Sequence, residues 1–145
     1  MDVVQWSYQK YQGEKMSIPT RVNIKLWLDH QGNVQLGAGR AELLRRVGEL
    51  GSLKKAAESL GMSYRAAWGR IKRIEEALGI AMVEAAGARR DGYQLTPEGR
   101  ELVDAFMLWY EDVCRYALEK AAHLPMLHAQ GVEAHHRQAS SDDVL

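Results

Sequence analysis

Apolar residues recur at three- and four-residue intervals between residues 41 and 78, a spacing that predicts three consecutive helices. The first helix spans residues 41–50. Ser52 and Ser63 are suitable N-caps for a short second helix and a longer third helix. Each apolar stripe is followed by a glycine suited to a C-terminal cap, namely Gly51, Gly61 and Gly79. A short helix, a tight turn and a longer helix are typical of a helix-turn-helix.

Alternation of apolar and polar residues before these helices predicts a β-hairpin. A half-buried strand is expected over residues 21–29, turn residues follow at 31–33, and residues 34–36 supply a short return strand. The side chains expected on the buried face of the first strand are Val22, Ile24, Leu26 and Leu28.

A wing and a long helix are predicted after the third helix. Segments 81–86 and 93–95 are expected to be short strands around the basic, glycine-bounded loop 87–92. Pro97 then stands at a first helical position, and no helix breaker follows before Pro125. At 1.5 Å per residue such a helix is roughly 35–40 Å long. A compact domain of this size does not need so long a helix internally, so we expect it to project.

Composition narrows the architecture to one domain with extensions. The chain has 145 residues, of which 46% are hydrophobic and 26% charged, a balance that excludes a wholly disordered protein. No apolar run reaches the roughly 18 residues of a membrane span, and the N-terminus lacks an apolar signal-peptide core. We therefore expect a cytoplasmic protein without a membrane partner. The expected fold is mainly α with small β-sheets (α+β). We expect four segments, namely a flexible extension at 1–20, a winged helix-turn-helix with its hairpin at 21–96, a long dimerisation helix at 97–124 and a disordered tail at 125–145.

The formal net charge is zero, but the charges are unevenly distributed along the chain. Residues 1–39 carry a net charge of +1. Residues 40–100 carry 12 basic and 8 acidic side chains, for a net charge of +4, whereas residues 101–145 carry 3 basic and 8 acidic ones, for a net charge of −5. This polarity favours an anionic partner for the helix-turn-helix and keeps the long helix away from it.

The third helix indicates that this partner is double-stranded DNA. Its apolar stripe begins at Ala67, and the opposite side is basic, with no acidic residue between Ser63 and Ile74. The DNA major groove admits one α-helix and attracts such a face. Arg65 is close to the N-terminus of the helix, where side chains reach base edges, and the later basic residues suit phosphates. The residues expected to contact DNA are Ser52, Lys54, Ser63, Tyr64, Arg65, Gly69, Arg70, Lys72, Arg73, Arg89 and Arg90.

Several of these positions have a second interpretation. We expect Trp68 to pack against the second helix rather than to contact DNA, and Tyr64 suits either role. Gly69 indicates close approach of a phosphate or chance tolerance of glycine. Arg89 and Arg90 either contact DNA next to the major groove or form a solvated hairpin tip.

The chain resembles the LysR-type winged helix-turn-helix and, more closely, the N-terminal DNA-binding domain of the molybdate-responsive ModE regulators. The resemblance rests on segment 51–57, on Met-Ser-Tyr-Arg-Ala-Ala-Trp at 62–68 and on Leu-Thr-Pro-Glu-Gly at 95–99, and it covers roughly residues 20–122. It implies a transcriptional regulator that dimerises through its N-terminal region and long helix and places the helix after Ser63 in the major groove. ModE proteins continue into molybdate-binding domains, which we do not expect here. We therefore do not expect molybdate to be an effector of this chain.

The long helix independently favours a homodimer. Two adjacent apolar stripes run along it, and one would suffice to pack against the domain. A symmetric dimer would favour a near-palindromic DNA site. The residues expected at this interface are Leu102, Phe106, Trp109, Tyr110, Val113 and Ala117.

Other classes of function fit the residues less well. Cys114 is the single cysteine, and no histidine at helical spacing activates it as a nucleophile, so we expect no catalytic residue and no enzyme. We expect neither a metal site nor a cofactor, although the sequence contains His123, His128, His135 and His136. A winged-helix adaptor that binds proteins remains the alternative, and the basic third helix argues against it.

Overall fold

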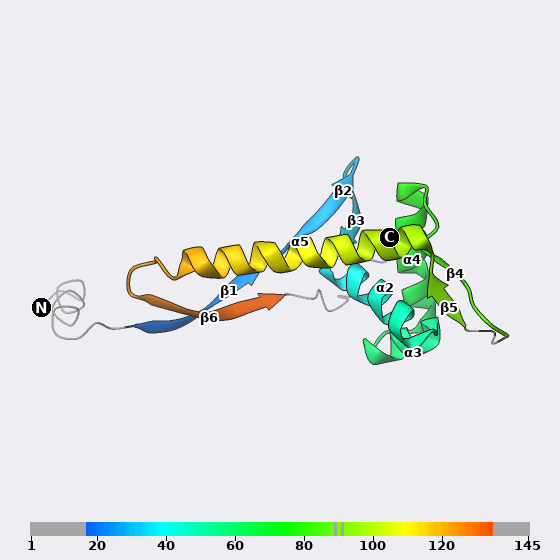
Figure 1. Cartoon of the computed structure of the whole chain (residues 1–145), viewed down its shortest axis with the longest axis horizontal. Coiled ribbons are helices and arrows are strands. Elements are labelled where there is room, and N and C mark those ends of the chain that lie inside the picture. Colours follow the sequence, from blue (N-terminus) through cyan, green and yellow to red (C-terminus); the bar gives the residue numbers. More distant parts are fainter. Residues whose placement is uncertain (1–16, 89, 91, 135–145) are drawn as a thin grey trace, which may run out of the picture. The chain divides into compact units, whose positions relative to one another are not determined.

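The computed structural model describes residues 17–88, 90 and 92–134. These residues divide into two compact units, one formed by residues up to Ile24 together with Asp112–Ala134, and the other by residues between Lys25 and Glu111. The elements in chain order are β1 (Ile18–Ile24), β2 (Trp27–His30), β3 (Asn33–Gly37), α2 (Ala38–Leu50), α3 (Leu53–Ser59), α4 (Tyr64–Leu78), β4 (Val83–Ala85), β5 (Tyr93–Leu95), α5 (Pro97–Ala121) and β6 (Leu127–Ala134) (Figure 1).

The three predicted helices of the helix-turn-helix region are confirmed as α2, α3 and α4, and local chemistry explains their ends. The Ser52 hydroxyl accepts a hydrogen bond from the Lys55 amide at 3.2 Å and opens α3. The Ser63 hydroxyl accepts one from the Ala66 amide at 3.1 Å and opens α4. Each such cap contributes about 1 kcal/mol. Glycines with positive φ follow α2 and α4, where an L side chain would be strained: Gly51 (φ +62°) and Gly79 (φ +67°).

The core of the second unit lies between these helices and the strands that flank them. The buried side chains are mostly aliphatic and come from β3, α2, α3, α4, the segment before β4, both wing strands and α5. Because α2 contacts α3, α4, β3 and β5, it is the central element of this unit. The large side chains that are fully buried here are Leu36, Leu43, Leu44, Val47, Leu53, Ile71, Ile74, Met82 and Val103.

The predicted wing is confirmed as the antiparallel pair β4–β5, in which Val83 faces Leu95 and Ala85 faces Tyr93. Thr96 follows β5, and its hydroxyl donates to the Ala81 carbonyl at 2.7 Å and accepts from the Gly99 amide at 3.0 Å. A Cβ on Gly99 would lie 2.3 Å from the Met82 carbonyl oxygen, so glycine allows α5 to begin directly against this segment. The helix ends at Ala121, three residues before its predicted end at 124.

The prediction of one strand over residues 21–29 is wrong. The chain leaves the strand at Lys25 and Leu26, so that β1 and β2 belong to different sheets. Only β2 forms the predicted hairpin with β3, around Gln31 and Gly32, which both have positive φ. Because the strand is interrupted and the β2–β3 register shifts after Leu28, the expected alternation fails there, and Leu28 is exposed instead of buried.

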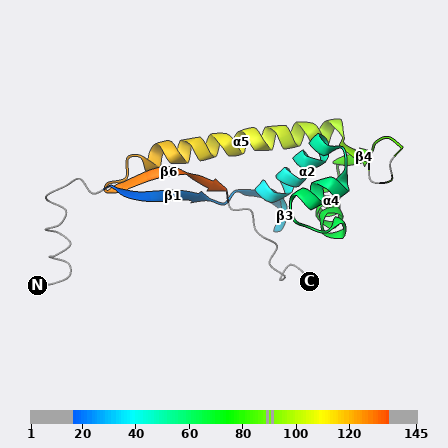
Figure 2. The ribbon, with the colours of Figure 1, turned by 90° about the horizontal axis from the view of Figure 1, so that it is seen from below.

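The first unit contains a parallel pair of strands that the sequence did not predict. β1 pairs with β6 from Ile18 opposite Leu127 to Ile24 opposite Ala134, with one irregularity after Thr20 (Figures 1 and 2). The expected disordered tail is therefore wrong for residues 127–134, and the expected flexible extension is wrong from residue 18 onward. Both segments are short and mix apolar with polar residues, and their pairing bridges about a hundred residues, which local patterns do not reveal. The remaining parts of both expectations, residues 1–16 and 135–145, lie outside the described residues.

A charged network stabilises the outer face of α2. Glu42 accepts from Arg45 Nε at 2.8 Å and from Arg46 Nε at 2.8 Å, and Arg45 also pairs with Glu49. The hydrogen bonds from Arg45, followed by those from Arg46, outweigh the effect of burial and lower the pKa of Glu42 from its usual 4.5 to about 2. Ionised Glu42 is therefore favoured in the folded state.

This network predicts an acid-dependent loss of stability. Because the pKa of Glu42 is lower in the folded chain, its contribution is complete above about pH 4.5 and declines as the pH falls toward 2. The two arginine side chains are about one third exposed, so screening reduces the contribution to about 1–2 kcal/mol. The measurement is the difference in free energy of unfolding between wild type and Glu42→Gln, by urea at pH 6 and pH 2.5. The difference should shrink by about 1–2 kcal/mol; an equal difference at both pH values would contradict this assignment.

Candidate nucleic-acid interface

The α4 helix separates apolar from basic side chains as its sequence predicts. Ala67, Ile71 and Ile74 are buried, and Leu78 at the end of the stripe is half-buried. The basic residues lie on the other side of the helix. Arg65 and Arg73 are exposed and Arg70 is half-buried, and within the described part of the chain these three arginines form no salt bridge.

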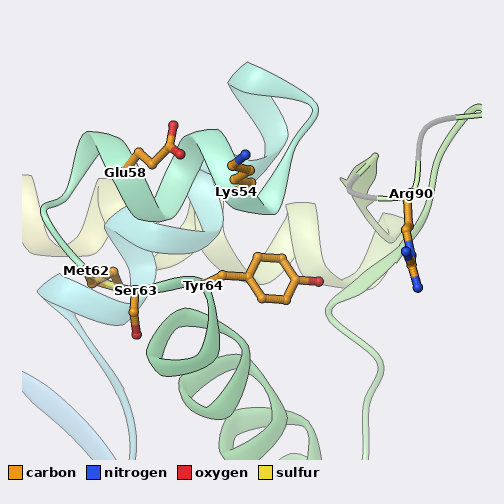
Figure 3. Close-up of a pocket in the computed structure, with 6 residues that line it drawn as sticks. All are labelled: Lys54, Glu58, Met62, Ser63, Tyr64 and Arg90. Carbon is orange, nitrogen blue, oxygen red and sulfur yellow. The ribbon is translucent and has the colours of Figure 1, made fainter.

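A hollow of about 660 Å³ lies between α3, the start of α4 and the wing. Figure 3 shows Lys54 on α3 to one side, Arg90 on the wing to the other, and the Tyr64 ring extending between them from the first residue of α4. Two cations on separate elements therefore flank a phenol hydroxyl at one surface. The hollow is lined by Lys54, Glu58, Met62, Ser63, Tyr64 and Arg90.

Glu58 and Met62 line this hollow but were not among the residues predicted to contact DNA. Glu58 follows Lys54 by one helical turn, so both side chains project from the same side of α3 (Figure 3). A helical wheel of α3 was therefore the available signal for Glu58. Met62 belongs to the turn between α3 and α4, and no periodic pattern identifies it.

The structure ties Lys72 to other side chains of the protein. Its Nζ atom is 2.6 Å from Glu75 Oε2 and 4.4 Å from the centroid of the Trp68 ring. The Trp68 ring in turn packs on Tyr93 of β5, with 5.5 Å between centroids. The ring partner of Trp68 is thus in the wing, whereas we expected packing on the second helix. Lys72, which was expected to contact phosphate, therefore pairs with Glu75, while 41% of its side chain is exposed.

The structure also shows the surroundings of three other residues that were predicted to contact DNA. Ser52 is only 6% exposed and caps α3, so it does not belong to the exposed basic surface. Ser63 is exposed and caps α4. A Cβ on Gly69 would meet nothing within 4 Å, so no neighbour within the chain requires glycine there. Arg89 lies outside the described residues.

The apolar residues of α5 divide into buried and exposed sets. Phe106 and Tyr110 are 3% and 7% exposed and stack on each other, so they belong to the chain's own core rather than to a surface. Trp109 is 39% exposed and meets Phe106 edge-on. The other expected dimerisation residues, Leu102, Val113 and Ala117, are half-buried. Two further residues are more exposed than any of the expected set: Leu108 (60%) and Tyr116 (63%).

The described residues contain no group of three or more histidine, cysteine, aspartate or glutamate side chains placed to hold a metal ion. His123 and His128 are exposed, and Cys114 is half-buried on α5. His135 and His136 lie outside the described residues. Across the same described part of the chain, no helix combines the length and the apolar character that crossing a membrane requires.

Comparison with known proteins identifies the region that carries this surface. Residues 39–100 match the family described as bacterial regulatory helix-turn-helix protein, lysR family. Two molybdenum-pterin-binding proteins of Rhodobacter capsulatus are similar in sequence. MopB is 38% identical over 74 residues, which are 50% of this chain and 27% of MopB, and MopA is 31% identical over 85 residues, which are 57% of this chain and 32% of MopA. The chain therefore spans about a third of these relatives or less.

The fold comparison agrees with the sequence match. The crystal structure of the CbnR_DBD–DNA complex resembles this chain with a TM-score of 0.50 at 22% identity, over 57% of this chain and 92% of that one. This similarity confirms the predicted winged helix-turn-helix fold. The two molybdenum-pterin-binding relatives support the ModE-like character of the sequence. Residues 39–100 are thus similar to the helix-turn-helix of bacterial regulatory proteins of the lysR family.

Proposed function

We propose that this chain is a sequence-specific, DNA-binding transcriptional regulator whose recognition helix is α4. The observation that carries the proposal is the exposed arginine surface of α4, beside a hollow flanked by Lys54 and Arg90. Arginines without acidic partners favour an anionic ligand. The DNA major groove is wide enough to admit a single α-helix that presents such arginines. The similarity to a domain solved in complex with DNA supports the same partner.

The positions on α4 suggest a division of roles. Arg65 is the second residue of α4 and is exposed, so it is placed to enter the groove deeply and pair with guanine. Arg73 lies two turns further along and suits a phosphate. Lys54 and Arg90, on opposite sides of the hollow, suit the phosphates of one backbone strand that passes the Tyr64 hydroxyl.

We further propose that the chain acts as a homodimer through α5 and binds a near-palindromic site. The support is the exposed apolar surface of α5, above all Trp109 and Tyr116, which are seven residues apart and therefore share one helical face. Two-fold symmetry would set the recognition helices roughly 34 Å apart, one turn of DNA. The match covers only a minor part of the two molybdenum-pterin-binding relatives, so their ligand is not proposed for this chain.

Salt dependence provides the direct test of DNA binding. Three phosphate contacts per protomer, from Lys54, Arg73 and Arg90, give a dimer six, so log K should fall against log salt with a slope of about −5. Affinity for a duplex selected from random sequence should drop roughly 1,000-fold between 50 and 200 mM salt in a gel-shift assay. A triple variant in which these three residues become alanine should show a much shallower slope, and Arg115→Ala on α5 serves as the control. Absent or salt-insensitive binding would favour the adaptor alternative.

A further inference from the structure

Glu75 connects the recognition helix to the first strand of the wing. It lies in the last turn of α4, and its side chain is 11% exposed. Its Oε1 atom accepts hydrogen bonds from the backbone amides of Met82 at 2.9 Å and Val83 at 3.3 Å, immediately before and at the start of β4. One carboxylate oxygen thus holds the entry of the wing strand against the helix.

The other oxygen of Glu75 begins a second connection, to the other wing strand. Oε2 accepts from Lys72 Nζ at 2.6 Å, and Lys72 lies over the Trp68 ring, which packs on Tyr93 of β5. Burial would raise the pKa of Glu75, but the hydrogen bonds from Lys72 and the two amides outweigh it and lower this pKa. The carboxylate is therefore charged in the folded protein and pairs with the ammonium group of Lys72, whose side chain is 41% exposed.

We infer that Glu75 is a positioning residue for DNA recognition, which fixes both strands of the wing to the recognition helix and withholds Lys72 from DNA phosphates. The inference rests on the proposed function of α4 and the wing in DNA binding. A pattern of basic residues in the sequence does not reveal this role, because Glu75 is acidic.

The small size of the wing explains why it needs such a connection. β4 and β5 have three residues each, and a two-stranded hairpin of this length is marginally stable alone. Arg90 stands in the loop between them, so the angle of the wing decides which phosphate Arg90 reaches. Because Glu75 sets that angle relative to α4, Arg65 and Arg90 can contact their sites on DNA at the same time.

A double-mutant cycle with Arg90 tests the positioning role. We expect Glu75→Ala to weaken binding to the selected duplex about 5- to 10-fold, because the wing no longer holds Arg90 in place. In an Arg90→Ala background the same change should cost less than about 2-fold, since the wing contact is already lost. Glu75→Gln keeps an acceptor oxygen for the Met82 and Val83 amides and should retain most of the affinity. A loss of equal size in both backgrounds would show that Glu75 does not act through Arg90.

A matched pair of neighbouring substitutions tests whether Lys72 is withheld. Lys72→Met keeps the aliphatic stem over Trp68, and we expect the salt slope of binding to stay unchanged. Arg73→Met removes an exposed cation one residue later, and the slope should become shallower by about 0.9 per protomer. If Lys72→Met lowers the slope as much as Arg73→Met does, Lys72 contacts phosphate and the inference is wrong.

Two controls separate this inference from the proposed function and from misfolding. Wild-type protein that shows no salt-dependent DNA binding would overturn the proposed function itself. Wild-type protein that binds, with additive effects of Glu75→Ala and Arg90→Ala, would overturn the positioning role alone. Thermal unfolding of each variant identifies any loss of fold, and the comparison of Lys72→Met with Arg73→Met, which leaves Glu75 in place, keeps the inference testable if Glu75→Ala does not fold.

Discussion

Substitution of both Trp109 and Tyr116 by glutamate is expected to convert a dimer into a monomer and to weaken specific DNA binding at least about 100-fold. The physical reason is the cost of placing two carboxylates at an apolar helix–helix contact, where they would lose hydration without gaining partners. Each monomer would then hold one half-site, and the gain from binding two half-sites together would be lost.

The measurement is sedimentation equilibrium, followed by gel shifts with a full site and a half-site. A matched control is Arg115→Glu, which also changes the net charge by −2 and lies on the same helix, with a side chain that is 70% exposed and pairs with Asp112 at 3.0 Å. Exposed pairs of this kind contribute little, so the control should remain dimeric.

The single variant Tyr116→Glu guards against misfolding of the double variant. Trp109 packs on the buried Phe106 ring, and a glutamate there disturbs the chain's own core to some extent. Tyr116 is 63% exposed and its nearby cation, Lys120, is 5.3 Å from the ring centroid, so its replacement leaves the core intact. If both variants sediment like the wild type, α5 is not the dimer interface.

The helix-turn-helix was predictable because its determinants are local. Ser52 and Ser63 cap their helices through hydrogen bonds three residues ahead, and Gly51 and Gly79 end helices in the left-handed conformation that their position requires. The apolar stripe of α4 follows from helical spacing alone. Each of these features depends on a short run of consecutive residues, within the roughly 11–18 residues over which hydrophobic periodicity indicates backbone structure.

The features that were missed depend on partners that are distant in the sequence. β6 is a strand because β1 lies beside it, and neither segment has a pattern that identifies the other. Phe106 and Trp109 belong to the same predicted stripe, yet one is buried and the other is 39% exposed. A helical wheel assigns a face to a residue, but only the tertiary structure decides whether that face meets the chain itself or solvent.

The same limitation applies to the candidate interface. Lys72 is one of four basic residues in the α4 sequence, and nothing in its spacing distinguishes it from Arg73. The structure distinguishes the two residues. Glu75 accepts hydrogen bonds from the Met82 and Val83 amides, and its other carboxylate oxygen accepts one from Lys72. A count of basic residues on a helix therefore does not distinguish a cation that pairs with an acidic side chain of the protein from one that does not.

The division of roles on α4 leads to the second large expected effect. Arg65→Ala should weaken binding to the selected site by about 30-fold or more, because each bidentate contact to guanine contributes about 1–3 kcal/mol and a dimer loses two of them. Binding to random duplexes should change much less. Arg65→Lys should recover little of the loss, because an ammonium group lacks the planar fork of guanidinium.

Arg73→Ala is the matched control, since it removes the same side chain from an exposed position eight residues later on the same helix. A phosphate contact carries no sequence information, so this variant should weaken specific and random duplexes by the same factor and reduce the salt slope by about 0.9 per protomer. Quantitative gel shifts with both duplexes at several salt concentrations separate the two patterns. Equal, sequence-independent losses from both substitutions would mean that α4 contacts only the DNA backbone, and base recognition would then have to come from another part of the protein.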